Sequence, residues 1–277
     1  MRSIAILNQK GGVGKTTTAV NLSAALATSG QRVCLVDLDP QAHATLHLGL
    51  APGRDDRSVY DVLIADAKLS EVRHQVAEQL WVVGSHIDLA AAEVELAGVV
   101  GREVILRDKL AELDGEFDYL LIDCPPSLGI LTLNALAAVD EVVLPLQPHF
   151  LALHGLSKLL QTIDLVAKRL NGRLRLTGVV LCMYESGTRL AGEVAHDVDE
   201  FFRAARESRE RETPWSSAQT FQTRIRRNIR LAEAPSFGQS IFQYAADSNG
   251  AADYRALAQE ILEVGTHARP ESASLAR

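Results

Sequence analysis

The sequence predicts an α/β protein with a single doubly wound, mostly parallel sheet and helices on both faces. Two observations indicate this class. Short segments that are almost continuously apolar are typical of strands covered on both faces, and longer helical patterns alternate with them along the chain. Right-handed crossovers between parallel strands would bring the carboxyl ends of the strands to one edge of the sheet, where such proteins bind ligands.

Six segments are predicted strands and four are predicted helices. The strands are expected at residues 3–8, 32–37, 80–84, 118–123, 140–146 and 176–183. The helices are expected at residues 16–29, 151–170, 188–205 and 251–264. Residues 204–216 (AARESRERETPWS) are the most loop-like interior stretch. We expect one domain over residues 1–265 and a disordered tail over residues 266–277.

Composition and charge indicate a globular protein and argue against some classes of nucleic-acid-binding and membrane protein. The chain has 277 residues, 47% of them hydrophobic, which is enough for a sizeable core. Its net charge of −7 argues against a surface that coats nucleic acid generally, so such a contact would need a local basic patch. Cys34, Cys124 and Cys182 are far apart, which indicates buried thiols in a reducing compartment. No apolar run approaches the ~18 residues that span a bilayer, so we expect a soluble protein.

A phosphate-binding loop is predicted in the segment NQKGGVGKTTT, residues 8–18. It follows a predicted strand and precedes a predicted helix, as that motif requires. Its three glycines, Gly11, Gly12 and Gly14, would let backbone N–H groups surround phosphate oxygens at the positive end of the helix. Lys15 is expected to reach the β- and γ-phosphates, and Thr16 to place its hydroxyl on Mg²⁺. A glycine turn without phosphate binding is the alternative.

The loop departs from the usual motif at two positions. Gln9 stands where the motif has its first glycine, and a second lysine, Lys10, precedes the glycines. The run KGGVGKTT resembles the deviant Walker A loop of the ParA/MinD ATPase superfamily. The resemblance implies that Lys10 crosses a dimer interface to the partner's nucleotide, so that ATP binding and dimerisation become one event. The alternative is a solvated surface lysine. The expected nucleotide-binding residues of the loop are Lys10, Gly11, Gly12, Val13, Gly14, Lys15, Thr16 and Thr17.

Two further segments place carboxylates at strand ends. LVDLDPQAHAT, residues 35–45, carries Asp37 and Asp39 on one side of the chain and resembles the family's switch I, D-x-D-P-Q. The resemblance implies that Asp39 orients the attacking water and that Asp37 lies near the hydration shell of Mg²⁺. Catalytic roles therefore fall to Asp39, Lys10 and Lys15. A polar turn that closes a strand is the alternative.

YLLIDCPPSLG, residues 119–129, ends an apolar run in Asp123. This is the Walker B pattern, and D-x-P-P resembles the family's switch II. Asp123 would hold a magnesium-bound water, so the expected metal-side residues are Thr16, Asp37 and Asp123. Cys124 lies inside the motif, where a redox role and a buried filler are both open.

The resemblance extends from about residue 3 to about residue 264. LPLQPHFLALHGLSKLL, residues 144–160, resembles the family's strand and long helix, and NIRLAEAPSFGQSI, residues 228–241, resembles a block of Soj-like chromosomal ParA proteins. It implies base contacts by Asn228, but the family's usual proline two residues earlier is Arg226 here. Met183 is a further nucleotide candidate, with core filler as its alternative. The segment 204–220 is longer than is usual for the family.

A DNA site is predicted from a local excess of arginine. Residues 213–232 contain no acid, and such arginines can bind backbone phosphates without reading bases. The family's ATP-bound dimers bind DNA through this region, and Arg227 matches one such position. Pairing with Glu233 or with the acidic stretch 193–200 is the alternative. The DNA candidates are Arg189, Arg224, Arg226, Arg227 and Arg230.

The resemblance therefore implies an ATP hydrolase with Mg²⁺, a homodimer in the ATP state, nonspecific double-stranded DNA as a partner, and a ParB-like stimulating protein. We expect a cytoplasmic protein, nucleoid-associated when ATP is bound, that segregates a chromosome or plasmid. A ParA-like ATPase that positions a non-DNA cargo is the main alternative. A MinD-like membrane ATPase needs a basic, apolar C-terminal helix, yet the only bulky apolar residue of THARPESASLAR is Leu275. A metabolic relative, such as a nitrogenase-iron-protein-like reductase or a ligase, is a further alternative. A bridging iron–sulfur cluster needs suitably placed cysteines, which Cys34 and Cys124 do not supply.

Overall fold

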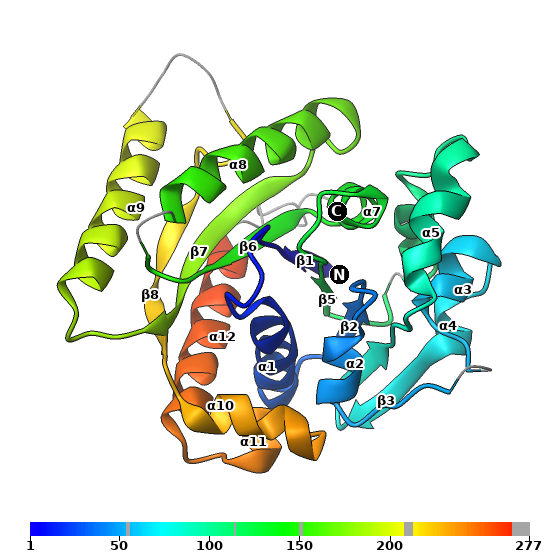
Figure 1. Cartoon of the computed structure of the whole chain (residues 1–277), viewed down its shortest axis with the longest axis horizontal. Coiled ribbons are helices and arrows are strands. Elements are labelled where there is room, and N and C mark those ends of the chain that lie inside the picture. The colour runs from blue at the N-terminus through cyan, green and yellow to red at the C-terminus, as the bar shows by residue number, and fades with distance from the viewer. Residues whose placement is uncertain (54–55, 114, 150–151, 208–212, 268–277) are drawn as a thin grey trace, which may run out of the picture.

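A computed structural model describes residues 1–53, 56–113, 115–149, 152–207 and 213–267. It contains an eight-stranded sheet in the order β3-β4-β2-β5-β1-β6-β7-β8, with helices around it (Figure 1). All neighbouring strands are parallel except β3 and β4, so the predicted fold class is confirmed. The strands are β1 Arg2–Ile6, β2 Val33–Asp37, β3 Arg73–Ala77, β4 Leu80–Val83, β5 Tyr119–Asp123, β6 Glu141–Leu146, β7 Arg175–Tyr184 and β8 Gln219–Arg226.

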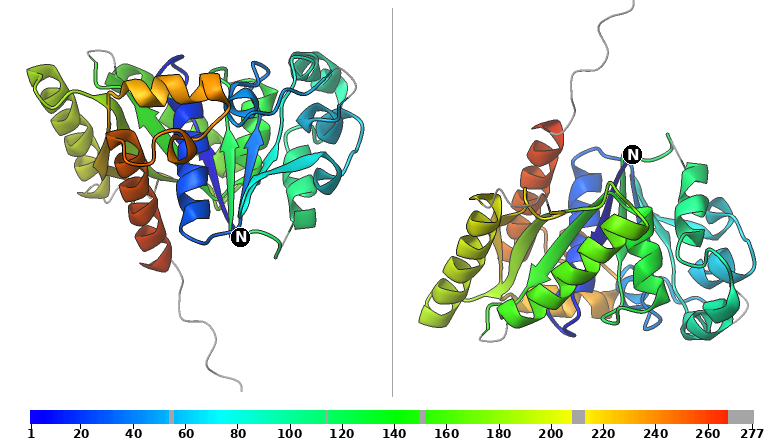
Figure 2. Two further views of the ribbon diagram at one scale, coloured as in Figure 1. Left: turned by 90° about the horizontal axis from the view of Figure 1, so that it is seen from below. Right: turned by 90° about the horizontal axis from the view of Figure 1, so that it is seen from above.

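Two helical layers enclose the sheet. The helices are α1 Lys15–Thr28, α2 His43–His47, α3 Val59–Ile64, α4 Leu69–Val72, α5 Leu89–Glu95, α6 Ile105–Leu110, α7 Ile130–Ala138, α8 Ala152–Arg169, α9 Arg189–Glu207, α10 Ile229–Glu233, α11 Ile241–Tyr244 and α12 Asn249–His267. Side chains alternate along β1: Ile4 and Ile6 join a core with α1 and α12, and Ala5 and Leu7 join a core with α7, α8 and α9. Figure 2 shows the sheet between these layers.

All predicted strands and helices are present, but two strands were missed. β3 (RHQVA) and β8 (QTFQTRIR) are the two edge strands of the sheet. In β8 only Phe221 and Ile225 are buried, so the segment lacks the apolar run typical of the inner strands. The predicted loop 204–216 was wrong at its start, because α9 continues to Glu207, and residues 208–212 lie outside the described residues. Of the predicted tail, Thr266 and His267 belong to α12, and the rest lies outside the described residues.

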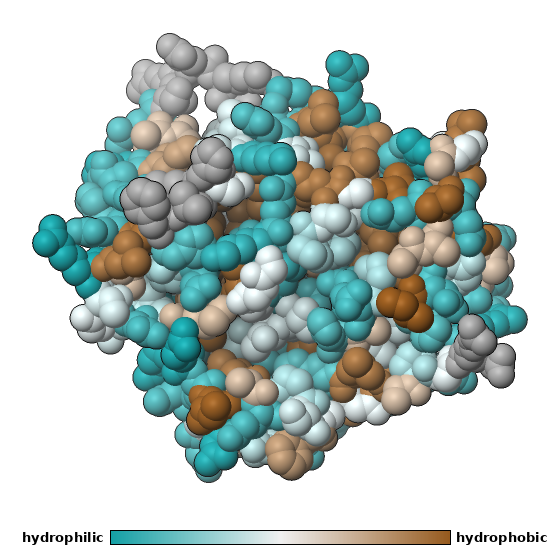
Figure 3. All heavy atoms as spheres, in the orientation of Figure 1, coloured by the Kyte–Doolittle hydropathy of each residue, from teal (hydrophilic) through white to brown (hydrophobic). Residues whose placement is uncertain are grey.

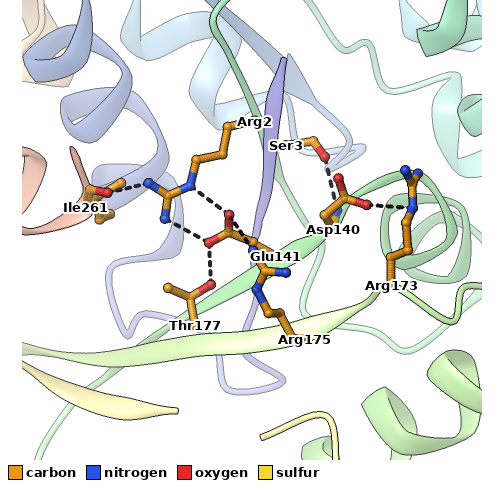
Figure 4. Close-up of polar contacts among 8 residues, drawn as sticks. All are labelled: Arg2, Ser3, Asp140, Glu141, Arg173, Arg175, Thr177 and Ile261. Atoms are coloured by element: carbon orange, nitrogen blue, oxygen red, sulfur yellow. Dashed lines mark hydrogen bonds and ion pairs between the residues drawn. The ribbon is translucent and has the colours of Figure 1, made fainter. Parts of the chain in front are cut away.

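An ion-pair network joins the amino ends of β1, β6 and β7 (Figure 4). The Glu141 carboxylate is 3% exposed and accepts hydrogen bonds from Arg2 at 2.7 and 2.8 Å and from the Thr177 hydroxyl at 2.5 Å. Arg175 pairs with the same carboxylate at 3.5 Å, and Arg2 also donates to the carbonyl of Ile261 in α12. Each buried charge in this network has a partner, as such charges require.

The surface is mixed, and exposed apolar side chains occur in several regions, one of them around α5. Ile87, Val94, Val99 and Val100, on and around α5, are all exposed, and Val100 is 99% exposed. Figure 3 shows brown atoms toward the upper right, where Figure 1 places α5 and α7. Among the described residues, no helix combines the length and the apolar character needed to cross a membrane.

Candidate nucleotide-binding site

The predicted phosphate-binding loop connects β1 to α1. Gly12 and Gly14 have φ angles of +73° and +93°, in the left-handed region that favours glycine. Gly14 is the N-cap residue of α1, and its carbonyl accepts the first helical hydrogen bond from Thr18 N at 2.8 Å. The loop therefore delivers its backbone directly to the positive end of a helix, which is an anion-binding geometry.

The two lysines of the loop have different surroundings. Lys15 is 7% exposed and donates from Nζ to the carbonyl of Lys10 at 3.1 Å. Burial lowers the pKa of Lys15, and the nearby carboxylates of Asp123 and Asp39 oppose that shift. Lys10 is exposed, although its backbone is fixed by a 3.0 Å hydrogen bond from its N–H to Asn8 Oδ1. Lys15 thus faces the interior of the site, and the Lys10 ammonium is open to solvent.

A cavity of about 740 Å³ lies beside the loop. It contacts most of the predicted nucleotide-binding residues, namely Gly11, Gly12, Gly14, Lys15, Thr16, Thr17, Met183 and Asn228. Lys10 and Val13 do not line it, and the Val13 side chain is buried at 1% exposure. Its lining combines glycines, Lys15 and Asp39 with apolar residues such as Ile225 and Leu231. Its composition suits a ligand with an anionic end and an apolar end.

Asp37 and Asp123 lie opposite each other at the ends of the paired strands β2 and β5. Both are fully buried. Asp37 Oδ2 accepts hydrogen bonds from Thr45 N at 2.9 Å and Thr45 Oγ1 at 2.7 Å, and its Oδ1 accepts from Asp39 N at 3.1 Å. Burial nevertheless raises the pKa of Asp37 to about 6. Its hydrogen bonds show that Asp37 orients the segment that carries Asp39.

Asp123 is the buried carboxylate without a firm partner. Among the described residues, neither of its oxygens accepts a hydrogen bond within the usual distance and angle limits. Its pKa is raised well above the usual value, first by burial and then by the charge of Asp37, whereas the Thr16 hydroxyl and Lys15 act against the shift. An orphaned carboxylate next to a hydroxyl fits Mg²⁺, which binds oxygen and keeps several waters. In the described chain no three His, Cys, Asp or Glu side chains are arranged so that they could hold a metal ion by themselves, so Thr16 and Asp123 would share the ion with phosphate and water.

Asp39 forms part of the cavity wall. Its Oδ1 accepts a hydrogen bond from Gln41 N at 2.9 Å, and its carbonyl accepts one from the Ser85 hydroxyl at 2.8 Å. Thr45 therefore holds the Asp37 carboxylate and Ser85 holds the backbone of Asp39, and sequence analysis missed both residues. Ser85 follows β4, a distant strand, so nothing local in the sequence indicates its contact. Gln41 and His43 also line the cavity and could have been inferred from their place beside the D-x-D-P-Q motif.

The rest of the cavity wall includes residues from segments far apart in the chain. Met183, near the end of β7, has a φ angle of +50°, a strained conformation that is concentrated at functional sites. Asn228 is the N-cap residue of α10, and its Oδ1 accepts from Arg230 N at 2.8 Å. Tyr254 reaches the cavity from α12, and its hydroxyl lies 3.1 Å from Thr18 Oγ1. Sequence analysis missed Tyr254, because helix α12 carries no motif.

The predicted DNA-binding arginines lie around the carboxyl ends of β7 and β8, and each has a side-chain partner. Arg189 pairs with Glu193 at 2.7 Å, Arg227 with Glu185 at 2.8 Å, and Arg230 with Glu233 at 2.9 Å. The Arg224 guanidinium lies 4.4 Å from the ring centroid of Tyr184, and Arg226 pairs with Asp253. The first three pairs are largely exposed. Exposed pairs contribute only about 0–1 kcal/mol, so a phosphate can replace the carboxylate.

The three cysteines are buried and free. Burial raises the pKa of Cys34 and of Cys182 to about 12 and raises that of Cys124 well above its usual value. A thiol held in its neutral form is a poor nucleophile. Cys124 is therefore a buried filler in this structure.

A glycine-rich turn that opens a helix opposite a buried, unpaired carboxylate is the way P-loop NTPases hold nucleotide and magnesium, and the chain is a P-loop NTPase by fold and site. The sequence model of the family described as "AAA domain" matches residues 1–176. "Chromosome partitioning protein ParA" of Myxococcus xanthus is 44% identical over 97% of this chain and 90% of its own. "Sporulation initiation inhibitor protein Soj" of Bacillus subtilis is 46% identical over 95% of this chain and 98% of its own. The chain belongs to the ParA/Soj-type family of partitioning ATPases.

Solved structures agree with this fold. The structure of cobyrinic acid a,c-diamide synthase from Mycobacterium smegmatis, with bound ADP and magnesium, is 37% identical to this chain. It covers 97% of each chain with a TM-score of 0.80.

Proposed function

We propose that this chain is a magnesium-dependent ATP hydrolase that dimerises when it binds ATP and then binds DNA without sequence preference. A ParB-like partner stimulates its otherwise weak hydrolysis and switches it off, and the cycle segregates a chromosome or plasmid. The observation that carries the dimer is the pair of lysines: Lys15 occupies the cavity, and Lys10 is exposed beside it. An exposed ammonium on the phosphate-binding loop is available to a second subunit.

The residues of the site divide the chemistry between them. Lys15 and the backbone N–H groups of the loop hold the phosphates. Thr16 and Asp123 would hold Mg²⁺ and its water, and the ion would supply positive charge beside the phosphates. Asp39, at the cavity wall, orients the attacking water, and Asp37 holds the switch segment through Thr45.

The names of the relatives favour partitioning over metabolism. The two curated relatives named above, at 44% and 46% identity, are a partitioning ParA and a Soj protein, and the M. smegmatis synthase is 37% identical. We therefore propose a cytoplasmic protein that associates with the nucleoid when ATP is bound. Arg189, Arg224, Arg227 and Arg230 would contact DNA phosphates, because their partners are exposed or uncharged.

The dimer is tested with Lys10→Ala. We expect this variant to bind ATP and to stay monomeric in light scattering, whereas wild type with ATP becomes a dimer. Lys68→Ala, which removes a lysine elsewhere on the chain, is the control and should dimerise as wild type does. A Lys10→Ala protein that dimerises normally would contradict this role of Lys10.

DNA binding is tested in Asp39→Ala, which should hold ATP without hydrolysing it. We expect this protein to bind random-sequence duplex DNA with ATP and not with ADP, more weakly as salt rises. Adding Arg227→Ala should weaken binding and reduce the salt dependence. A protein that dimerises with ATP but binds no DNA would favour a non-DNA matrix and cargo.

A further inference from the structure

Arg226 is held differently from the other arginines of its segment. Asp253 of α12 is only 7% exposed, and both of its oxygens accept hydrogen bonds from Arg226. The bonds come from the backbone N at 3.0 Å, from Nε at 3.1 Å and from Nη2 at 2.5 Å. Two guanidinium donors and the backbone N–H thus fix one edge of the Arg226 side chain, yet 49% of that side chain remains exposed.

The buried partner makes Arg226 a poor ligand for DNA phosphate. Arg227 can leave Glu185, because both side chains are at least half exposed and water can solvate the released carboxylate. If Arg226 left Asp253, it would strand a buried charge, which is strongly unfavourable. While the pair is intact, Asp253 neutralises Arg226. What Arg226 then offers is a flat, immobile surface with little net charge.

Arg226 is one of the residues that line the nucleotide cavity. Its neighbours Ile225, Arg227 and Asn228 line the same cavity, as does Tyr254, which is next to Asp253 on α12. In the proposed function the glycines and Lys15 hold the phosphates, so the nucleoside of a bound nucleotide would occupy the rest of the cavity, whose lining includes Arg226. A guanidinium plane packs favourably on an aromatic ring, more so when water is excluded.

We propose that Arg226, positioned by Asp253, is the surface against which the adenine base of ATP packs. The assignment rests on the proposed ATP binding and replaces, for this one residue, the role in DNA binding. Because Asp253 orders the guanidinium before the ligand arrives, little further conformational entropy is lost on binding. The Arg226–Asp253 pair would contribute to the base-dependent part of nucleotide affinity and leave phosphate binding unchanged.

The test compares two ligands that differ by the nucleoside. Mg²⁺-ATP and Mg²⁺-triphosphate are titrated calorimetrically into wild type, Arg226→Ala, Arg226→Lys and Arg255→Ala. We expect Arg226→Ala to weaken ATP binding about 3- to 20-fold and to leave triphosphate binding unchanged. Lysine should not restore affinity, since it lacks the planar group. Arg255, exposed on α12 and over the Phe242 ring, is the matched control and should bind both ligands as wild type does.

In Arg226→Ala the buried Asp253 is left without its partner, so a second variant removes both charges. Arg226→Ala/Asp253→Asn eliminates both charges and should show the same ATP-specific loss. DNA binding by ATP-saturated Arg226→Ala should match wild type, in contrast to Arg227→Ala. Equal losses for ATP and triphosphate, no loss for either, or a loss of DNA binding alone would overturn the assignment. Failure of wild type to bind ATP would instead overturn the proposed function on which it rests.

Discussion

A buried carboxylate at the amino ends of the parallel strands has charged partners, whereas one at the carboxyl ends accepts no hydrogen bond among the described residues. At the amino ends, Glu141 is 3% exposed and has Arg2, Arg175 and Thr177 as partners. At the carboxyl ends, Asp123 is fully buried, lies beside Asp37 and lacks a hydrogen-bond partner among the described residues. Burial acts to raise the pKa of Glu141, but its interactions with Arg2, Thr177 and Arg175 together lower it, whereas the pKa of Asp123 is raised by burial and by Asp37.

The difference separates structural charges from functional ones within one sheet. A paired buried charge joins strands, since removing either partner leaves an uncompensated ion. An unpaired buried charge costs stability, and a fold retains it where function requires it. The amino ends should therefore determine the stability of the empty protein, and the carboxyl ends its chemistry.

The largest expected effect is on hydrolysis, from Asp123→Asn. Loss of the magnesium-side carboxylate should reduce ATP hydrolysis by on the order of 100-fold or more. The same change should stabilise the nucleotide-free protein by about 1–3 kcal/mol, because it removes a buried carboxyl group that accepts no hydrogen bond among the described residues. Phosphate release and urea unfolding measure the two effects. A variant that is inactive and also less stable would contradict the proposed contrast between the two ends.

The next effect is on stability, from Glu141→Ala. This change should lower the free energy of unfolding by about 3–5 kcal/mol, because Arg2 is left buried without its carboxylate. ATP hydrolysis, measured well below the melting temperature, should stay near the wild-type rate. Glu112→Ala is the control, because Glu112 is 42% exposed and lies 3.8 Å from Lys109. If Glu141→Ala were no more harmful than the control, the amino-end network would not be a stabilising feature.

The pH dependence of stability should have opposite signs at the two ends. The folded pKa of Asp37 is raised to about 6 from 3.8, so the folded protein takes up a proton first, and stability should rise as pH falls from 7 toward 4. The folded pKa of Glu141 lies below its usual 4.5, so its contribution is present above pH 4.5 and is lost as pH falls through the folded value.

Nucleotide-free unfolding measured from pH 3 to pH 8 checks both signs. Wild type should gain unfolding free energy as the pH falls from 7 to 4, and Asp37→Asn should lack that gain. Below pH 4.5 wild type should lose the contribution of Glu141, and Glu141→Gln should show a smaller loss. If Asp37→Asn had the same dependence of unfolding free energy on pH as wild type above pH 4, the pKa of Asp37 would not be raised in the nucleotide-free protein.

The smallest effect is expected from Asp118→Asn, also at the amino ends of the strands. Arg32 and Asp118 form a 2.8 Å pair, but their side chains are 45% and 38% exposed. Water and salt screen such a pair, so the loss should stay below about 1 kcal/mol and shrink further in high salt. A loss comparable to that of Glu141→Ala would show that position in the sheet matters more than burial.

Local patterns in the sequence were sufficient for the inner strands, the phosphate loop and the motif carboxylates. The apolar runs around Ile4, Leu35 and Leu121 indicate buried parallel strands, because both faces of such strands must be covered. The glycines before Lys15 and the aspartates at strand ends indicate phosphate and magnesium, since their chemistry lies in residue type and spacing. The edge strand β8 was missed because half of it faces solvent.

The tertiary structure alone decided which charges are satisfied. Thr45 donates to the Asp37 carboxylate, and Ser85 donates to the backbone carbonyl of Asp39. From α12, Tyr254 reaches the cavity and Asp253 pairs with Arg226. The sequence showed Arg226 as one member of a basic cluster, yet its partner lies 27 residues away. The sequence by itself therefore determined the fold class and the phosphate chemistry. The fold decided which carboxylate stays unpaired and where each arginine is held, because burial and pairing depend on contacts between distant segments.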